Sequence, residues 1–205
     1  MTSLLRWSLL KVCKSTKVGE YQAIGFSDWN QNPKDDALFV ARTTEALKLI
    51  EQLDPRRFAR IKRYIRYIQN TELYSGGRFI HGICQIDFGR YNFIAHPDWS
   101  LYQYAGTIIH EATHGMLHAK SIRYRKSNWV QIEGICRAEQ NRFLSRIQSP
   151  YGSNLLRPFL PREWEIMGSS LTKFRTFMRR MKEEEQKAQQ PGPECPSQGV
   201  GSPRP

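Results

Sequence analysis

Apolar residues recur every three to four positions over long parts of this chain, which is the spacing of one face of a helix. Asp54 followed by Pro55 gives one such segment an N-cap and a first-turn proline. Ser100 and Gln103 have the S-x-x-Q spacing of a capping box at the start of another. The pattern predicts helices over residues 44–53, 55–69, 101–119, 131–147 and 162–188.

Shorter segments are rich in β-prone residues or alternate between apolar and polar ones. They predict strands at residues 21–26, 37–41 and 78–88. Turn-forming residues separate the first two, and Gly89 ends the third. The predicted strands and helices together favour an α+β domain with a small sheet.

The two ends of the chain differ in composition from its middle. Residues 4–10 are apolar, but Arg6 interrupts them and no small-residue cleavage site follows, so we expect part of the fold or a weak amphipathic arm. The last fifteen residues are rich in Pro, Gly, Ser and Gln and hold no aromatic residue, which is typical of disorder. We therefore predict an N-terminal arm and first strand at 1–36, the main domain at 37–188 and a disordered tail at 189–205.

The candidate chemistry lies in the helix predicted over 101–119, in the HExxH pentapeptide His110-Glu111-Ala112-Thr113-His114. Positions i and i+4 of a helix lie one above the other, so the two imidazoles point to one place, as two zinc ligands do. Glu111 is about 100° further round the helix, where its carboxylate reaches a water bound to the metal. The motif predicts a zinc site with Glu111 as general base, and ordinary packing of two histidines is the alternative.

A third ligand is available at a suitable distance. Catalytic zinc takes three protein ligands and keeps a fourth position for water. Glu133 follows His114 after 18 intervening residues, near the start of the next predicted helix. With these residues, the chain resembles the gluzincin metallopeptidases over residues 78–147, in the HExxH-x18-E pattern of their aminopeptidase-type branch. The resemblance implies a zincin-like domain with a small sheet, an HExxH active-site helix and a glutamate-bearing helix beside it.

The resemblance also implies roles for single residues. His110, His114 and Glu133 would bind Zn²⁺, and Glu111 would activate the water that cleaves a peptide or protein substrate. Tyr151 is the closest match to the family's downstream residue that stabilises the oxyanion, and Tyr124 is an alternative. The strand at 78–88 matches the family's edge strand, along which extended substrates pair. The motif that recognises a free amino group in aminopeptidases is absent, so their specificity is not carried over.

Three other side chains near the motif are further candidates for the site. Glu139 replaces Glu133 if the two helices are offset by about two turns, although the spacing and the following glycine favour Glu133. His118 shares a face with His114, but a straight helix rises about 12 Å between positions i and i+8, which favours a place at the rim. Cys136 lies one turn after Glu133, where it either faces the site or is a small buried thiol.

Charge and cysteine content change this picture little. Lys and Arg number 31 against 19 Asp and Glu, a formal net charge of +12, but the charges are spread over many segments. The rival function is therefore a basic binding protein with a structural or vestigial zinc site, in which the helix at 55–69 contacts nucleic acid or another anionic partner. No run approaches the roughly 18 apolar residues of a membrane-spanning helix. The widely spaced Cys13, Cys84, Cys136 and Cys195 favour reduced thiols and a cytoplasmic protein.

Overall fold

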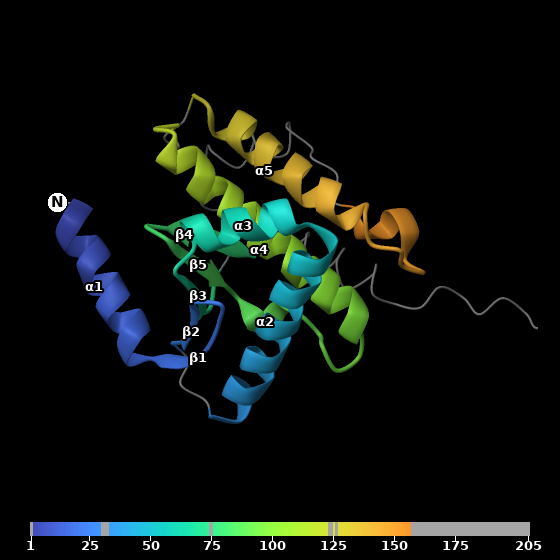
Figure 1. Cartoon of the computed structure of the whole chain (residues 1–205), viewed down its shortest axis with the longest axis horizontal. Coiled ribbons are helices and arrows are strands. Elements are labelled where there is room, and N and C mark those ends of the chain that lie inside the picture. The colour runs from blue at the N-terminus through green and yellow to red at the C-terminus, as the bar shows by residue number, and fades with distance from the viewer. Residues whose placement is uncertain (1, 30–32, 74–75, 123–124, 126, 157–205) are drawn as a thin grey trace, which may run out of the picture.

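The computed structural model describes residues 2–29, 33–73, 76–122, 125 and 127–156. Within them the chain forms helices and strands in an α+β arrangement, which confirms the predicted class (Figure 1). The elements are α1 (Thr2–Ser15), β1 (Lys17–Tyr21), β2 (Ile24–Asp28), α2 (Pro33–Leu53), α3 (Pro55–Tyr64), β3 (Tyr67–Asn70), β4 (Gly77–Ile80), β5 (Ile83–Ile86), α4 (Pro97–Ala119) and α5 (Trp129–Leu144). Short 3₁₀ turns follow at Phe88–Arg90 and Gly152–Leu155.

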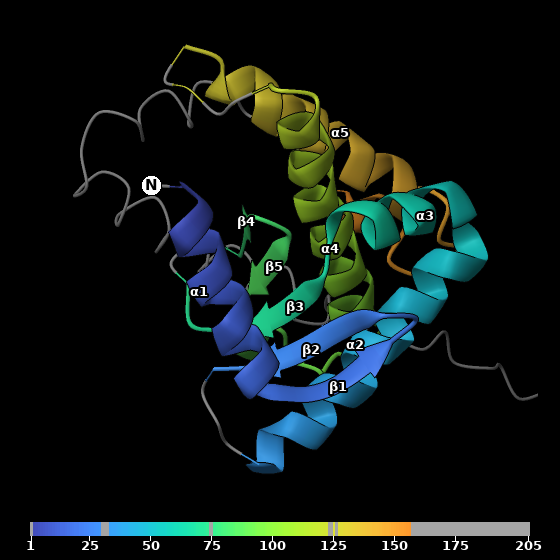
Figure 2. The same cartoon turned by 60° about the vertical axis from the view of Figure 1, so that its left-hand side comes forward.

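The five strands form one mixed sheet in the order β1-β2-β3-β5-β4. The hairpins β1/β2 and β4/β5 are antiparallel, whereas β2 pairs with β3, and β3 with β5, in parallel. The parallel step from β2 to β3 is made through α2 and α3, and α3 packs against α2 and α4 (Figure 2). This order leaves β4 as the last strand on one side of the described sheet. The segment 1–36, predicted to hold one strand, contributes two strands to this sheet.

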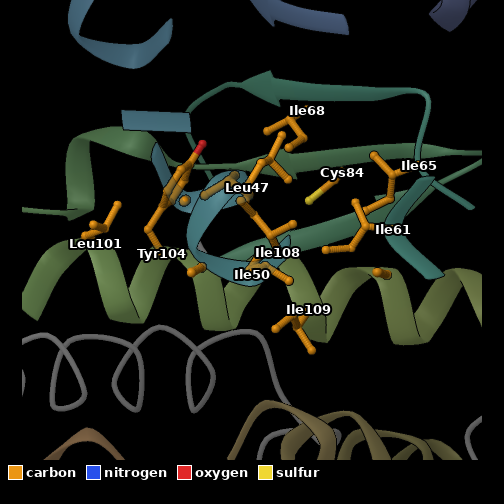
Figure 3. Packing of buried hydrophobic residues seen from close by; sticks show 14 of the residues in the cluster. Leu47, Ile50, Ile61, Ile65, Ile68, Cys84, Leu101, Tyr104, Ile108 and Ile109 are labelled. Carbon is orange, nitrogen blue, oxygen red and sulfur yellow. The ribbon is translucent and has the colours of Figure 1, made fainter. Parts of the chain in front are cut away.

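The core fills the space between one face of the sheet and helices α2, α3 and α4 (Figure 3). The residues that line it are aliphatic or aromatic and almost fully buried: Leu47, Ile50, Ile61, Ile68, Cys84, Leu101, Tyr104 and Ile108. The hydroxyl of Tyr104 forms a 2.8 Å hydrogen bond with that of Thr43, which ties α4 to α2. Because this burial fixes the rotation of α4 about its axis, it also fixes which of its side chains reach α5.

The opposite face of the sheet is partly covered by α1, and a row of polar side chains crosses it. Gln69 on β3 donates to the sulfur of Cys13 on α1 at 3.5 Å and accepts from Gln85 on β5 at 2.6 Å. Gln85 in turn accepts from the guanidinium of Arg78 on β4. Since buried polar groups need partners, this row stabilises the pairing of β3, β5 and β4.

Two predicted elements have the wrong type. Residues 37–41, predicted as a strand, belong to α2, where Phe39 is fully buried. Residues 65–69, predicted as the end of a helix, leave it: the backbone is extended at Ile65, with φ −108° and ψ 125°, and β3 begins at Tyr67. Ile65 and Ile68 are buried as expected. The pattern therefore predicted the burial of these residues correctly and their backbone conformation incorrectly.

Two predicted single strands are hairpins. Residues 78–88 fold as β4 and β5 with a turn at His81 and Gly82, whose φ angles are 48° and 91°. Residues 21–26 contain the turn between β1 and β2, where Gln22 and Ala23 have φ angles of 45° and 68°. Positive φ at both turn residues matches the twist of two-residue hairpins.

The helix starts are confirmed in one case and shifted in another. Asp54 caps α3, and its carboxylate accepts from the backbone N–H of Arg57 at 3.1 Å. The helix predicted over 101–119 begins earlier, at Pro97, so Ser100 lies inside it. The helix predicted over 162–188 and the tail at 189–205 lie outside the described residues. Among the described helices, none combines the length and the apolar character needed to cross a membrane.

Candidate metal centre

The two histidines of the HExxH motif lie one turn apart on α4, on the side turned toward α5. Their Nε2 atoms are 3.2 Å apart. Both side chains are largely buried, with 10% of His110 and 15% of His114 exposed. The helical backbone of α4 therefore directs both imidazoles to one point, as the i, i+4 spacing predicts.

Glu133 reaches the same point from α5. Its Oε2 atom lies 3.1 Å from Nε2 of His110, and its Oε1 atom lies 3.3 Å from Nε2 of His114. Helices α4 and α5 pack side by side along much of their length (Figures 1 and 2). Glu133 stands in the second turn of α5, level with the two histidines. The structure therefore brings together the three side chains that the sequence proposed as ligands.

Glu139, the alternative third ligand, lies away from the imidazoles in a cluster of arginines. Its carboxylate pairs with Arg57 at 3.1 Å, Arg60 at 2.7 Å and Arg142 at 2.6 Å. These groups lower the pKa of Glu139: burial alone would raise it, but the hydrogen bonds from Arg60 and Arg142 outweigh that effect. Glu139 therefore holds α5 against α3, and it does not compete with Glu133 for the histidines.

Cys136, which the sequence left open as either a site residue or a small buried thiol, lies beside the two histidines. It is fully buried, one turn after Glu133, and it packs with Leu117 and Ile132. Its sulfur and one ring nitrogen from each of His110 and His114 all lie within 4.8 Å of one another. The i+3 spacing from Glu133 was the signal that places both side chains on the face of α5 that meets α4.

Burial and proximity set the charges in this cluster. Burial lowers the pKa of His110 to about 4, so this imidazole is neutral near pH 7. Burial acts on His114 in the same direction, but hydrogen bonds with Cys136 and Glu133 outweigh it and raise the pKa of His114 to about 11. The pKa of Glu133 is lowered well below its usual range, because hydrogen bonds with both histidines outweigh the opposing effect of burial. The nearby Glu133 carboxylate thus favours the protonated form of His114.

Glu111 lies outside the cluster, on the side of α4 that faces β4. Only 4% of the residue is exposed, and its Oε2 atom has no hydrogen-bond partner among the described residues. Burial raises the pKa of Glu111 to about 7, against the smaller opposing effect of His114. A β-carbon built on Gly77 would stand 2.6 Å from Oε1 of Glu111, so the carboxylate fills the space that this glycine leaves. Gly77 is a residue that the sequence prediction missed.

The cluster offers donor atoms for a metal ion. Comparison of the chain with family models, curated proteins and solved structures gives no match.

Zinc binds imidazole nitrogen, carboxylate oxygen and thiolate sulfur, and bonds of 2.0–2.1 Å in a tetrahedral shell separate neighbouring N and O ligand atoms by about 3.3 Å. The observed separations among His110, His114 and Glu133 are 3.1, 3.2 and 3.3 Å. Each oxygen of the Glu133 carboxylate therefore lies at such a separation from the Nε2 atom of one histidine.

The other candidate residues lie elsewhere or outside the described residues. Tyr151 packs against Trp99 and Tyr102, with ring centroids 5.3 and 6.5 Å away. Those partners precede His110 on α4 by eight residues or more, about 12 Å of rise, so the structure does not bring Tyr151 to the cluster. His118 contacts the rings of Phe79 and His81, near the end of α4. Tyr124 lies outside the described residues.

Proposed function

We propose that this protein is a zinc-dependent hydrolase that cleaves peptide bonds, with the zincin-like arrangement expected from its resemblance to gluzincins. One observation carries the proposal. The two carboxylate oxygens of Glu133 each stand at ligand spacing from a different histidine, while the carboxylate of Glu111 stays separate and buried. This arrangement supports three metal ligands and one general base, which is the division of labour that metal-assisted hydrolysis needs.

The residues would divide the work as follows. His110, His114 and Glu133 would hold the ion, which when bound would supply Lewis-acid activation of water and of the substrate carbonyl. Glu111 would accept a proton from the attacking water at its carboxylate and pass it to the nitrogen of the leaving amine. Its pKa of about 7 suits this exchange, since a base works best when its pKa is near the working pH.

The position of strand β4 favours a peptide as the substrate. It is the last strand of the described sheet on that side, and the Glu111 carboxylate fills the space that a side chain at Gly77, at its start, would need. An extended peptide that adds to a sheet edge gains backbone hydrogen bonds with little dependence on its sequence. A peptide aligned along β4 would therefore place one of its bonds next to the proposed base.

The rival function, nucleic-acid binding through α3, finds less support. Arg57 is buried and pairs with Asp54 and Glu139, and Arg60 pairs with Glu139 and donates to Thr113. These arginines hold α3, α4 and α5 together, so they do not form a free phosphate-binding face. The other basic residues of the predicted face are exposed, so packing accounts for only part of its charge: Arg56, Lys62, Arg63 and Arg66.

The test is hydrolysis of a mixed fluorogenic peptide library by the full-length, zinc-loaded protein. We expect turnover in the wild type and a loss of at least 100-fold in Glu111→Gln, because the amide does not accept the proton. Zinc content, measured by elemental analysis, should be the same in both. Glu45→Gln, an exposed carboxylate on α2, is the matched control and should keep full turnover. Equal turnover in Glu111→Gln and wild type would refute the role of Glu111.

A further inference from the structure

Cys136 stands at the candidate metal centre, and the proposed hydrolytic scheme does not use it. Its sulfur lies within 4.8 Å of a ring nitrogen of both histidines and forms a hydrogen bond with His114. The chain has two other described cysteines, Cys13 on α1 and Cys84 on β5, and neither belongs to this cluster. The position of Cys136 is thus specific to the centre.

We propose that Cys136 is a fourth protein ligand of the metal held by His110, His114 and Glu133, and that its thiolate closes the resting site. This inference rests on the metal centre of the proposed function and adds a way in which that centre is regulated. On binding, the S–H bond of Cys136 breaks, a metal–sulfur bond forms, and the proton leaves to solvent. Zinc accepts this donor set, since thiolate, imidazole and carboxylate are its ordinary ligands.

Between Cys136 and the two histidines, metal binding requires a small adjustment. Zinc–sulfur and zinc–nitrogen bonds of about 2.3 and 2.1 Å place the sulfur and nitrogen atoms of a tetrahedral shell about 3.6 Å apart. The ligand atoms of Cys136 and the two histidines are at most 4.8 Å apart before any metal is present. A shift of about 1 Å closes this difference, which a change in the Cys136 side-chain torsion provides.

The consequence for activity follows from the number of ligands. Zinc sites with four protein ligands are closed and structural, whereas hydrolytic sites keep one position for water. A bound Cys136 would occupy the position that water needs, so the thiolate must leave before hydrolysis. Replacement of Cys136 by alanine would open that position permanently, while the other three ligands stay in place.

Cobalt(II) substitution tests the inference directly. Cobalt occupies zinc sites, and a thiolate ligand produces a charge-transfer absorption band in the near ultraviolet that nitrogen and oxygen ligands do not. We expect the band in the cobalt-loaded wild type and its loss in Cys136→Ala, with the bound cobalt still near one per chain. Cys13→Ala, Cys84→Ala and Cys195→Ala are the matched controls and should retain the band. In the zinc-loaded proteins, Cys136→Ala should hydrolyse peptide at least several-fold faster than the wild type.

The outcomes separate this inference from the proposed function. Stoichiometric cobalt in the wild type without the thiolate band would overturn the role of Cys136 and leave the three-ligand site intact. Retention of the band in Cys136→Ala would overturn it as well. Absence of any bound cobalt or zinc in the wild type would overturn both proposals. Loss of the band in Cys136→Ala alone, together with faster hydrolysis, would support both.

Discussion

Replacement of Gly77 by alanine tests how closely β4 holds the proposed general base. The added β-carbon would stand 2.6 Å from Oε1 and 3.1 Å from the carboxyl carbon of Glu111, and 3.0 Å from a methyl group of Thr107. All three distances are shorter than an ordinary van der Waals contact. Since Thr107 and Glu111 belong to a buried part of α4, the strand, the carboxylate or both must move.

The size of the effect follows from these distances. Ordinary contact begins near 3.4 Å, so the strand and the carboxylate must separate by about 0.8 Å. A misplacement of about 1 Å in a catalytic site costs up to about 100-fold in rate. We therefore expect Gly77→Ala to lower kcat about 10- to 100-fold. The zinc content should not change, because Glu111 lies outside the proposed ligand set.

The assay is peptide hydrolysis by the zinc-loaded protein, with kcat and KM measured separately. Gly76→Ala is the matched control, because a β-carbon at that neighbouring glycine would meet its nearest atom, on Arg90, at 3.7 Å. It should retain wild-type kcat. A folded Gly77→Ala protein with kcat within twofold of the wild type would show that Glu111 is not held by this contact, and the reasoning would fail.

Two further predictions concern stability. Glu139→Gln should lower the free energy of unfolding by about 2 kcal/mol, since it weakens charged hydrogen bonds to arginines. Because the pKa of Glu139 is lowered in the folded protein, its contribution is present above the unfolded-state pKa of about 4.3 and is lost as pH falls through the folded-state pKa. Gly115→Ala should cost about 1–3 kcal/mol, because the added β-carbon would stand 2.9 Å from the Phe79 ring and 3.0 Å from the β-carbon of Tyr64.

Urea unfolding checks both predictions. For Glu139→Gln, the difference from wild type should shrink when the measurement is repeated near pH 3, and a constant difference between pH 7 and pH 3 would contradict the assigned charge. For Gly115→Ala, unchanged stability would show that β4 and α4 have room to separate at this point.

The site was more predictable from the sequence than the strands around it. A helix fixes the i, i+4 relation locally, so His110 and His114 converge wherever the helix lies. The position of Glu133 depended on how α4 and α5 pack, but two neighbouring helices joined by a short connection tend to lie side by side, which limits the choices. The spacing of 18 residues therefore carried real information about geometry.

The failures have local physical causes. The turns at Gln22-Ala23 and His81-Gly82 have positive φ angles in three residues that are not glycine, so the usual Asn-Gly or Asp-Gly signal of a hairpin was absent. At Ile65 and Ile68, buried apolar residues continue the helical spacing of α3 by coincidence, although the backbone has already become extended. Short apolar segments do not distinguish a buried strand from a helix.

Tyr151 and Cys136 show the same limit in the site itself. Tyr151 was chosen by its order along the chain, but its ring packs near the start of α4, where it contacts Trp99. Cys136 was treated as an ordinary buried thiol because that is the common case, and its contact with the histidines depends on the rotation of α5. Tertiary packing decided the position of Tyr151. For Cys136, the i+3 spacing from Glu133 indicates a shared face of α5, and the packing of α5 on α4 decided that this face meets the histidines.

The central claim is that α4 and α5 together form one metal site, and zinc affinity measured by competition with a chelator tests it most directly. The account predicts about one tightly bound zinc per chain in the wild type and in Glu139→Gln. It predicts at least tenfold weaker binding in Glu133→Gln and loss of zinc in His110→Ala and His114→Ala, since each removes a ligand. Unchanged zinc affinity in both histidine variants, or loss of zinc in Glu139→Gln but not in Glu133→Gln, would contradict it.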